Sequence, residues 1–257
     1  MKTQFRSTIK FIKLTMDRLS NVFSLLAFAD EDAPTKAPAP ATSSSPATAS
    51  SPSSSSSSGR QGEKVNGSIE LEGFKQPLVW IDLEMTGLNI EVDRILEIAC
   101  IITDGRLTKS VEGPDLVIHQ TKDCLDKMGE WCQTHHAASG LTEKVLQSTI
   151  SESEAENQVM EFVKKHVGSE TPLLAGNSVY VDFQFLKKYM PDLAALFSHV
   201  VVDVSSVTAL CIRWYPKERR KAPTKQNKHR ALDDIRESIN ELKFYKESIF
   251  KANKSRR

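Results

Sequence analysis

The sequence predicts an α/β domain in which a mixed central sheet is flanked by helices. Three apolar segments rich in β-branched residues follow one another, "PLVWIDL", "ILEIACIIT" and "DLVIHQ", with turn-forming stretches between them. Further along the chain, segments with helical spacing of apolar residues alternate with two short apolar runs. Strands first, followed by alternating helices and strands, are typical of a sheet covered by helices.

The elements expected after this three-strand meander are mostly helices. Helical patterns cover "KDCLDKMGEWCQ" and "SESEAENQVMEFVKKHV", where Ser151 and Glu154 form a capping box before a stripe of Ala155, Val159, Phe162 and Val163. Strands are expected at "PLLAG" and "HVVVDV", with helices at "VYVDFQFLKKYM" and "SVTALCIRWY". The last helix, "ALDDIRESINELKFYKESIF", places on one face Leu232, Ile235, Ile239 and Leu242.

Composition divides the chain into four parts. With 257 residues and 39% hydrophobic content, the chain has room for one substantial core. From Ala33 to Ser58 nearly all residues are Ser, Ala, Pro or Thr, which lack the apolar area needed to offset the entropy of ordering. We expect an N-terminal extension (1–32), a disordered linker (33–73), a folded domain (74–250) and a basic tail (251–257).

Charge and cysteine content exclude several classes of function. The 34 Lys and Arg residues against 33 Asp and Glu leave a net charge of +1, so a large basic surface for long nucleic acid is not expected. Any nucleic acid partner should be short or locally held. The cysteines at 100, 124, 132 and 211 form no Cys-x-x-Cys pair, which fits neither a zinc site nor a disulfide scaffold. Reduced thiols in an intracellular compartment are expected.

The N-terminus has the character of a targeting segment. No acid precedes Asp17, while Lys2, Arg6, Lys10 and Lys13 are basic, a pattern that resembles a mitochondrial or plastid transit peptide. We therefore expect a mitochondrial protein. The alternative is a disordered extension, and synthesis from Met16 would leave the protein in the cytoplasm or nucleus. The longest apolar run, "VFSLLAFA", is far shorter than the roughly 20 residues of a membrane-spanning helix, so no membrane association is expected.

Two carboxylates interrupt the first strand. Alternate residues of a strand share a face, so Asp82 and Glu84 project together with Trp80. Their spacing suits divalent metal ions such as Mg²⁺, which prefer oxygen ligands. The alternative is an edge strand that carries two solvated acids.

Three further residues are candidates for the same metal site. A rotation of about 100° per residue puts Asp234 on the flank of the last helix's buried face and Asp233 in solvent. His229, just before that helix, could accept a proton from a water, although a lone His is more often a surface residue. Asp182 begins the helix after "LLAG", where an isolated acid more often serves the helix dipole.

The order "DLE", "GNSVYVD", "HRALDD" resembles the three exonuclease motifs of the DEDD superfamily in its histidine-bearing branch. The longer phrases "VWIDLEMTGL", "EWCQTHHAASGLT", "LLAGNSV", "FLKKYMP", "DVSSV" and "HRALDDIRESI" resemble the oligoribonuclease family in particular. The resemblance extends from about Leu78 to Phe250 and implies the ribonuclease H-like exonuclease fold.

The resemblance also implies a mechanism and a set of site residues. Two divalent metal ions, Mg²⁺ or Mn²⁺, are expected on Asp82, Glu84, Asp182 and Asp234, with His229 as the general base. The implied reaction is two-metal-ion hydrolysis of the 3′-terminal phosphodiester, which releases 5′-mononucleotides. The substrate-binding residues implied are Leu88 as a wedge between bases, Trp131 as a stacking platform, and His136, Ser178 and Ser205 near the ends and phosphates. Without the resemblance, Trp131 reads as a core residue beside Leu125 and Met128.

Two features depart from the family pattern or stay open. Family members usually carry Tyr-Arg before the "DVS" strand, where a neighbouring subunit contacts substrate, whereas this chain has His199 and Val200. That contact from the second subunit is therefore in doubt. The segment Tyr215 to Arg230 either attracts RNA or is only a solvated loop, and its basic residues are Lys217, Arg219, Arg220, Lys221, Lys225, Lys228 and Arg230.

The leading hypothesis is a homodimeric, metal-dependent 3′-to-5′ exoribonuclease that degrades short single-stranded RNA down to dinucleotides. A related exonuclease acting on DNA ends or longer RNA is the alternative within the enzyme class. A non-catalytic nucleotide-binding or scaffold module is the alternative from another class, and the presence of all four acids and the histidine argues against it.

Overall fold

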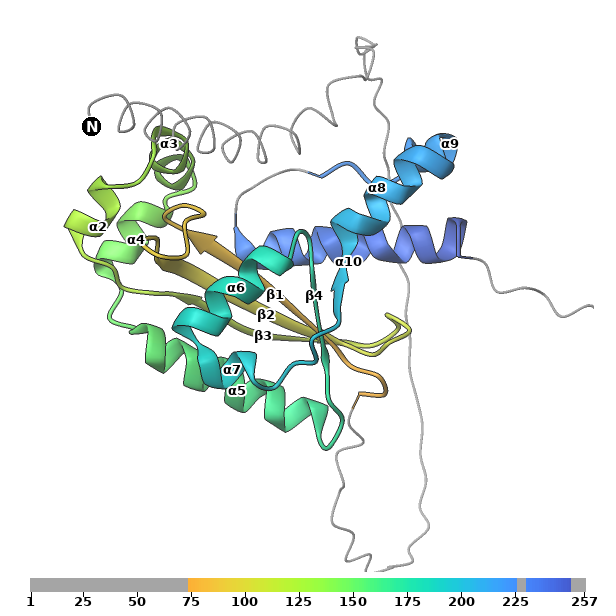
Figure 1. Ribbon diagram of the computed structural model, residues 1–257, viewed down its shortest axis with the longest axis horizontal. Coiled ribbons are helices and arrows are strands. Elements are labelled where there is room, and N and C mark those ends of the chain that lie inside the picture. The colour runs from red at the N-terminus through yellow and green to blue at the C-terminus, as the bar shows by residue number, and fades with distance from the viewer. Residues whose placement is uncertain (1–73, 226–229, 251–257) are drawn as a thin grey trace, which may run out of the picture. The chain divides into compact units, whose positions relative to one another are not determined.

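A five-stranded mixed sheet with strand order β3-β2-β1-β4-β5 is the centre of the domain in the computed structural model, which describes residues 74–225 and 230–250 (Figure 1). The strands are β1 (Leu78–Met85), β2 (Ile95–Thr103), β3 (Ser110–Val117), β4 (Leu173–Gly176) and β5 (Val201–Asp203). β1, β2 and β3 form an antiparallel meander, while β4 and β5 add to β1 in parallel. The predicted mixed sheet is confirmed. The expectations for the N-terminal extension, the linker and the tail fall outside the described residues.

Helices cover both faces of the sheet (Figure 1). α5 (Glu152–Val167), α6 (Tyr180–Tyr189) and α7 (Pro191–Ala194) pack on one face, where Val79, Ile81 and Leu83 share a core with Val159 and Phe185. α8 (Val204–Trp214) and α10 (Ala231–Ser248) pack on the other face. α9 (Pro216–Arg219) follows α8. The domain therefore has a helix, sheet, helix layering with two separate cores.

The side chains of α5 and α10 follow their predicted patterns. Ser151 is the N-cap of α5, and its hydroxyl accepts a hydrogen bond from the Glu154 backbone N–H at 3.2 Å. Ile235 and Ile239 of α10 are buried against the sheet, and Leu232 and Leu242 pack at the edge of the same core. Among the described residues, no helix is both long enough and apolar enough to span a bilayer.

The single helix predicted over 122–133 is wrong. The structure has two helices there, α2 (Lys122–Asp126) and α3 (Glu130–Ala138), followed by α4 (Leu141–Gln147), which the sequence pattern did not predict. Gly129 is the extended N-cap residue of α3, so the chain turns between α2 and α3 instead of continuing one helix. These short helices enclose a third core of Leu96, Leu125, Met128, Leu141 and Val145.

β1 is a central strand, so the edge-strand alternative is wrong. β2 pairs along its whole length on one side, and β4 pairs with residues 78–80 on the other. Trp80 is fully buried on the α10 face of the sheet, where its indole N–H donates to the Thr103 hydroxyl at 3.0 Å. The predicted alternation therefore holds, and it puts Asp82 and Glu84 on the same face as Trp80.

Candidate metal and substrate site

Three carboxylates from two elements meet on the α10 face of the sheet. Asp82 and Glu84 come from β1 and Asp234 from the first turn of α10, and one oxygen of each lies within 4.8 Å of the other two. Strand alternation brings the first two together, and the flank position of Asp234 on α10 brings the third. Asp233 instead pairs with Arg236 at 2.9 Å, on the outer side of the helix.

Asp182 lies beside this group and is not one of the three that converge. It is a buried residue in the first turn of α6, and its Oδ1 accepts a hydrogen bond from the Leu83 backbone N–H at 3.0 Å. Because β4 pairs with β1 only as far as Trp80, the Leu83 N–H has no strand partner on that side. Asp182 supplies the missing acceptor and is thereby held next to β1.

Burial and mutual repulsion make these acids weak. Burial, followed by the charges of Asp182 and Glu84, raises the pKa of Asp82 well above its ordinary value. Burial and the nearby Asp234 raise the pKa of Glu84 to about 8. Burial raises the pKa of Asp182 to about 7, and that of Asp234 to about 6. A divalent cation would offset this repulsion, and an all-oxygen donor set suits a hard ion such as Mg²⁺ or Mn²⁺.

A fifth acid, Glu97, lies next to the group and was not predicted. Glu97 of β2 is directly opposite Glu84 in the sheet and is fully buried. Its carboxylate binds the Arg230 guanidinium and the Ala231 backbone N–H at the start of α10. The only signal in the sequence is a glutamate within the continuous apolar strand "ILEIACIIT".

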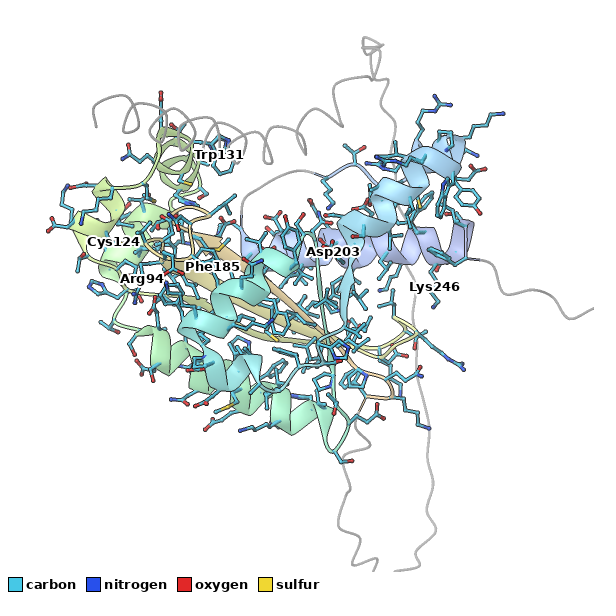
Figure 2. All side chains as sticks on the ribbon, in the orientation of Figure 1. Arg94, Cys124, Trp131, Phe185, Asp203 and Lys246 are labelled. Carbon is cyan, nitrogen blue, oxygen red and sulfur yellow. The ribbon has the colours of Figure 1, made fainter. Side chains whose placement is uncertain are left out.

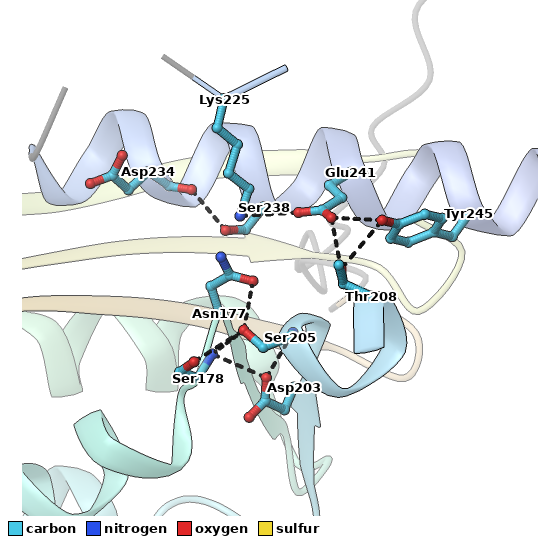
Figure 3. Close-up of polar contacts among 10 residues, drawn as sticks. All are labelled: Asn177, Ser178, Asp203, Ser205, Thr208, Lys225, Asp234, Ser238, Glu241 and Tyr245. Carbon is cyan, nitrogen blue, oxygen red and sulfur yellow. Dashed lines mark hydrogen bonds and ion pairs between the residues drawn. The ribbon is translucent and has the colours of Figure 1, made fainter. Parts of the chain in front are cut away.

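The predicted general base, His229, lies outside the described residues. The nearest described residues on either side of it, Lys225 and Arg230, are both paired with carboxylates. Lys225 pairs with Glu241 of α10 at 3.0 Å, and Arg230 pairs with Glu97 of β2 at 2.5 Å. Glu241 also accepts hydrogen bonds from the hydroxyls of Thr208 and Tyr245 at 2.7 and 2.8 Å (Figure 3).

Ser178 and Ser205 lie together at the carboxyl ends of β4 and β5 (Figure 3). The Ser178 N–H donates to Asp203 Oδ1 and to Ser205 Oγ, each at 3.0 Å, and the Ser205 N–H donates to the same Asp203 oxygen at 2.9 Å. The Ser205 hydroxyl donates to the Asn177 side-chain oxygen at 3.1 Å. One carboxylate oxygen thus joins the turn before α6 to the first turn of α8.

The Ser178 backbone is held in a strained conformation by these bonds. Its φ is +51°, in the left-handed region that residues other than Gly, Asn and Asp seldom adopt. Strain of this kind is retained where the surrounding contacts fix the backbone. Sequence reasoning missed Asp203 and Asn177, although Asp203 directly precedes "VSSV" as the N-cap of α8.

Leu88 lies in the segment between β1 and β2, while Trp131 and His136 lie in α3. Leu88 is half-buried. Trp131 of α3 is 40% exposed and its ring stacks on His135 at 3.8 Å, so the core interpretation of this residue is wrong (Figure 2).

His136 is buried, and its ring lies against the acids. Its Nε2–H donates to the Met85 carbonyl at 2.9 Å, and its Nδ1 lies 3.8 Å from a Glu84 oxygen. Burial lowers the pKa of His136, which favours the neutral ring. Of the predicted substrate-binding residues, His136 is therefore placed against a proposed metal ligand.

The structure answers in part the two questions left open by the sequence, which concern His199 with Val200 and the basic segment Tyr215 to Arg230. His199 and Val200 are both exposed just before β5. In the basic segment, Lys225 and Arg230 are used in the ion pairs described above, while Lys217, Arg220 and Lys221 are exposed. Lys228 falls outside the described residues.

A family model described as "Exonuclease" matches residues 79–242. Oligoribonuclease of Arabidopsis thaliana is 71% identical over 239 residues, which cover 93% of this chain and 100% of that protein. Mitochondrial oligoribonuclease of Homo sapiens is 51% identical over 180 residues, covering 70% of this chain and 76% of that protein. Oligoribonuclease of Marinobacter nauticus is 52% identical over 174 residues, covering 68% and 96%.

Solved structures with a similar fold include exonuclease I of E. coli in complex with an oligonucleotide, with a TM-score of 0.53 and 15% identity. Exonuclease I of Methylocaldum szegediense has a TM-score of 0.51 and 19% identity. Each alignment covers 68% of this chain and 41% of the solved chain, so this chain spans about two-fifths of those proteins. At this identity the likeness establishes the fold alone, which is the exonuclease fold that the sequence predicts.

Proposed function

Because this chain belongs to the oligoribonuclease family of exonucleases, we propose that it degrades short oligoribonucleotides from their 3′ ends to 5′-mononucleotides. Family membership makes it a hydrolytic nuclease. The observation that carries the proposed chemistry is the convergence of the half-buried Asp82, Glu84 and Asp234 within 4.8 Å on the α10 face of the sheet.

We assign the metal to Asp82, Glu84, Asp182 and Asp234, in keeping with their oxygen donors and raised pKa values. Two divalent ions, Mg²⁺ or Mn²⁺, would there polarise the scissile phosphodiester and stabilise the negative charge on its leaving oxygen. The four negative charges of these carboxylates balance the four positive charges of two divalent ions. Asp182 also has a structural task, because its Oδ1 is bonded to β1.

The remaining residues bind and orient the RNA. Leu88 separates the last two bases, and the exposed face of Trp131 stacks on one of them. Such stacking is worth roughly 1 to 3 kcal/mol per base and tolerates any base. Ser178 and Ser205, whose hydroxyls are 3.1 Å apart, lie near a phosphate at the end of the substrate. His136, whose Nδ1 lies 3.8 Å from a Glu84 oxygen, lies near the end of the substrate.

His229 is proposed as the general base that accepts a proton from the attacking water. The support is its place in the chain, directly before Arg230, whose side chain is bound beside the acids. A neutral imidazole has a pKa suited to this proton transfer near neutral pH. An exonuclease for DNA ends or longer RNA has less support, because the relatives that align over most of their length are named oligoribonucleases.

The partner proposed for the protein surface is a second copy of this chain. The C-terminal half of α8 exposes a patch of Leu210 and Trp214, which lie one turn apart on the same side of the helix, by 43 and 66%. Exposed apolar side chains grouped in this way are typical of an interface. The patch begins one turn after Ser205, so a second chain bound there lies close to the substrate residues.

For the cell compartment we propose the mitochondrion. The N-terminal sequence has the composition of a transit peptide, and relatives at about 50% identity are named mitochondrial. Imaging of two fluorescent fusions, one starting at Met1 and one at Met16, tests this. Mitochondrial signal from the first fusion alone is expected, and diffuse signal from both would contradict the assignment.

The function is tested by incubating the protein with end-labelled RNAs that range from dinucleotides to about twentymers, with Mg²⁺ or with EDTA. The ratio kcat/KM should be highest for the shortest RNAs, because the site described holds only the terminal bases. Asp82→Asn should be inactive and otherwise folded. Equal rates on long RNA or on DNA would favour the alternative exonuclease.

A further inference from the structure

We propose that Glu97 is a positioning residue that acts through Arg230: it fixes the first turn of α10 and thereby holds Asp234 against Asp82 and Glu84. This inference rests on the proposed metal site and adds a residue to it. Glu97 comes from β2, whereas Asp82 and Glu84 come from β1, so the contact connects three elements at the site.

The start of α10 lacks a cap of its own. Arg230 is the N-cap residue, and its side chain makes no capping hydrogen bond. Glu97 supplies the acceptor instead, since the Ala231 N–H donates to its Oε2 at 3.4 Å. The guanidinium of Arg230 binds the same carboxylate through Nε at 3.2 Å and through Nη2 at 2.5 Å. A buried carboxylate from the sheet therefore both caps the helix and neutralises the cation beside it.

The anchored residue is one turn away from Asp234. The Asp234 N–H donates to the Arg230 carbonyl at 3.0 Å, which is the first hydrogen bond of the helix. Fixing Arg230 therefore fixes the turn from which the Asp234 carboxylate projects. Without this anchor the first turn of a helix is free to fray, and Asp234 would lose its fixed place in the 4.8 Å group.

The geometry argues against Glu97 as a further metal ligand. Its Cα is opposite that of Glu84, so both side chains are on the α10 face of the sheet. However, both Glu97 oxygens are engaged by Arg230 or Ala231, and Glu97 is not in the converging group found among the described residues. Glu97 is also fully buried, where an unpaired carboxylate would be strongly destabilising, so the ion pair with Arg230 is integral to the fold.

The test measures metal binding directly. Mn²⁺ titrations of the full-length protein, with free Mn²⁺ read by electron paramagnetic resonance, are carried out on Glu97→Gln, Arg230→Gln and the double variant. Each single variant should bind Mn²⁺ about 10- to 100-fold more weakly, the range found for residues that orient metal ligands. The double variant should bind Mn²⁺ no more weakly than the weaker-binding single variant, because both substitutions break the same contact. Arg230→Lys should recover part of the affinity.

A matched control lies on the same helix. Arg236 makes a comparable pair with Glu112 of β3 at 2.7 Å, two turns from the anchor and on the exposed side. Glu112→Gln breaks this pair and leaves the Arg236–Asp233 pair of the first turn intact, so it should leave Mn²⁺ affinity unchanged. Thermal unfolding of all variants reports whether the fold is retained, and the double variant, which leaves no unpaired carboxylate in the core, tests the inference if Arg230→Gln does not fold.

Two results would overturn the inference. Unchanged Mn²⁺ affinity in both single variants would show that the anchor does not place Asp234. Loss of affinity in Glu97→Gln with none in Arg230→Gln would make Glu97 a direct ligand. Absence of Mn²⁺ binding by the unsubstituted protein would instead contradict the proposed function, and this inference with it.

Discussion

Asp82, Glu84, Asp182 and Asp234 are acids that the fold holds close together against their mutual repulsion. Their pKa values rise because burial and neighbouring carboxylates disfavour the charged forms. Sites arranged for chemistry commonly lower the stability of the protein in this way. The stability of the metal-free protein should therefore report on the site without any substrate.

The first prediction concerns pH. The pKa values of Glu84, Asp182 and Asp234 are raised to about 8, 7 and 6, so the folded protein holds protons that the unfolded chain has already lost above about pH 5. Stability falls with pH wherever the folded state binds more protons. In EDTA, the free energy of unfolding from denaturant titrations should therefore fall between about pH 5 and pH 8.

The controls for this experiment are Mg²⁺ and one variant. Saturating Mg²⁺ should flatten the fall, because the ion binds the ionised acids of the folded state. Asp82→Asn removes one charge from the group and should raise the stability of the metal-free protein at about pH 8 by roughly 1 kcal/mol. A metal-free stability that rises across this range would contradict the account of the acids.

The second prediction concerns Ser178 and Ser205, which are proposed to lie near a substrate phosphate. Asp203→Ala removes the acceptor shared by the Ser178 and Ser205 N–H groups. The Ser205 N–H is then left unsatisfied, at about 1 to 3 kcal/mol, and the Ser178 N–H keeps only its bond to Ser205 Oγ, which loosens the strained Ser178 backbone. We expect KM for a dinucleotide to rise roughly tenfold or more, which corresponds to about 1.4 kcal/mol. Asp203→Asn keeps the Oδ1 acceptor and is the matched control, so an equal rise in KM would contradict this role.

Sequence reasoning could find the residues whose position follows from periodicity. Asp82 and Glu84 follow from the two-residue repeat of a strand, and Asp234 rather than Asp233 follows from helical rotation. Glu97 could not be found, because its partner Arg230 is 133 residues away in the chain. Asp203 had a local signal as the N-cap of α8, but its bond to Ser178 spans 25 residues. Their roles depend on tertiary contacts that no local pattern records.

At the scale of elements, helices with a strong apolar stripe were predictable and short ones were not. α5 and α10 have long stripes that a sheet must cover, and both were predicted within two residues of their observed ends. α2, α3 and α4 have between five and nine residues, too few for a periodic signal. Gly129 was the local signal for the break between α2 and α3.

The third prediction concerns the contact between α5 and β3. Gly113 of β3 lies under Phe162 of α5, so that a Cβ at this position would be 2.3 Å from the Phe162 ring. Gly113→Ala should therefore lower the free energy of unfolding by about 1 to 3 kcal/mol, as overpacking does. The double variant Gly113→Ala, Phe162→Leu should regain part of that loss. Chemical denaturation measures both, and a neutral Gly113→Ala would contradict the packing described.

At the scale of the whole molecule, the proposed partner is a second copy. The fourth prediction is that Trp214→Glu, at the most exposed apolar residue of α8, converts a dimer into a monomer in light scattering after size-exclusion chromatography. A charge in a buried apolar interface has no partner and is strongly unfavourable. Lys217→Glu changes charge nearby without removing apolar area and should leave the dimer intact. A monomeric unsubstituted protein would contradict the assignment.

A single chain supplies all the residues proposed for metal binding. The folded domain has its own cores on both sides of the sheet, and the proposed metal ligands all come from one chain. The resemblance to the family implies a substrate contact from a second chain at the position of His199 and Val200, where family members usually carry Tyr-Arg. We therefore expect metal binding to be independent of dimerisation.

The most direct test of the central claim is the hydrolysis of a labelled ribodinucleotide by the full-length protein, with Mg²⁺ and with EDTA, beside Asp82→Asn. We expect release of 5′-mononucleotides with Mg²⁺ and none with EDTA. Asp82→Asn should lower the turnover rate by more than the roughly 100-fold that is typical when a residue that only orients a metal ligand is replaced. Hydrolysis that persists in EDTA, or an Asp82→Asn variant with near-native turnover, would contradict it.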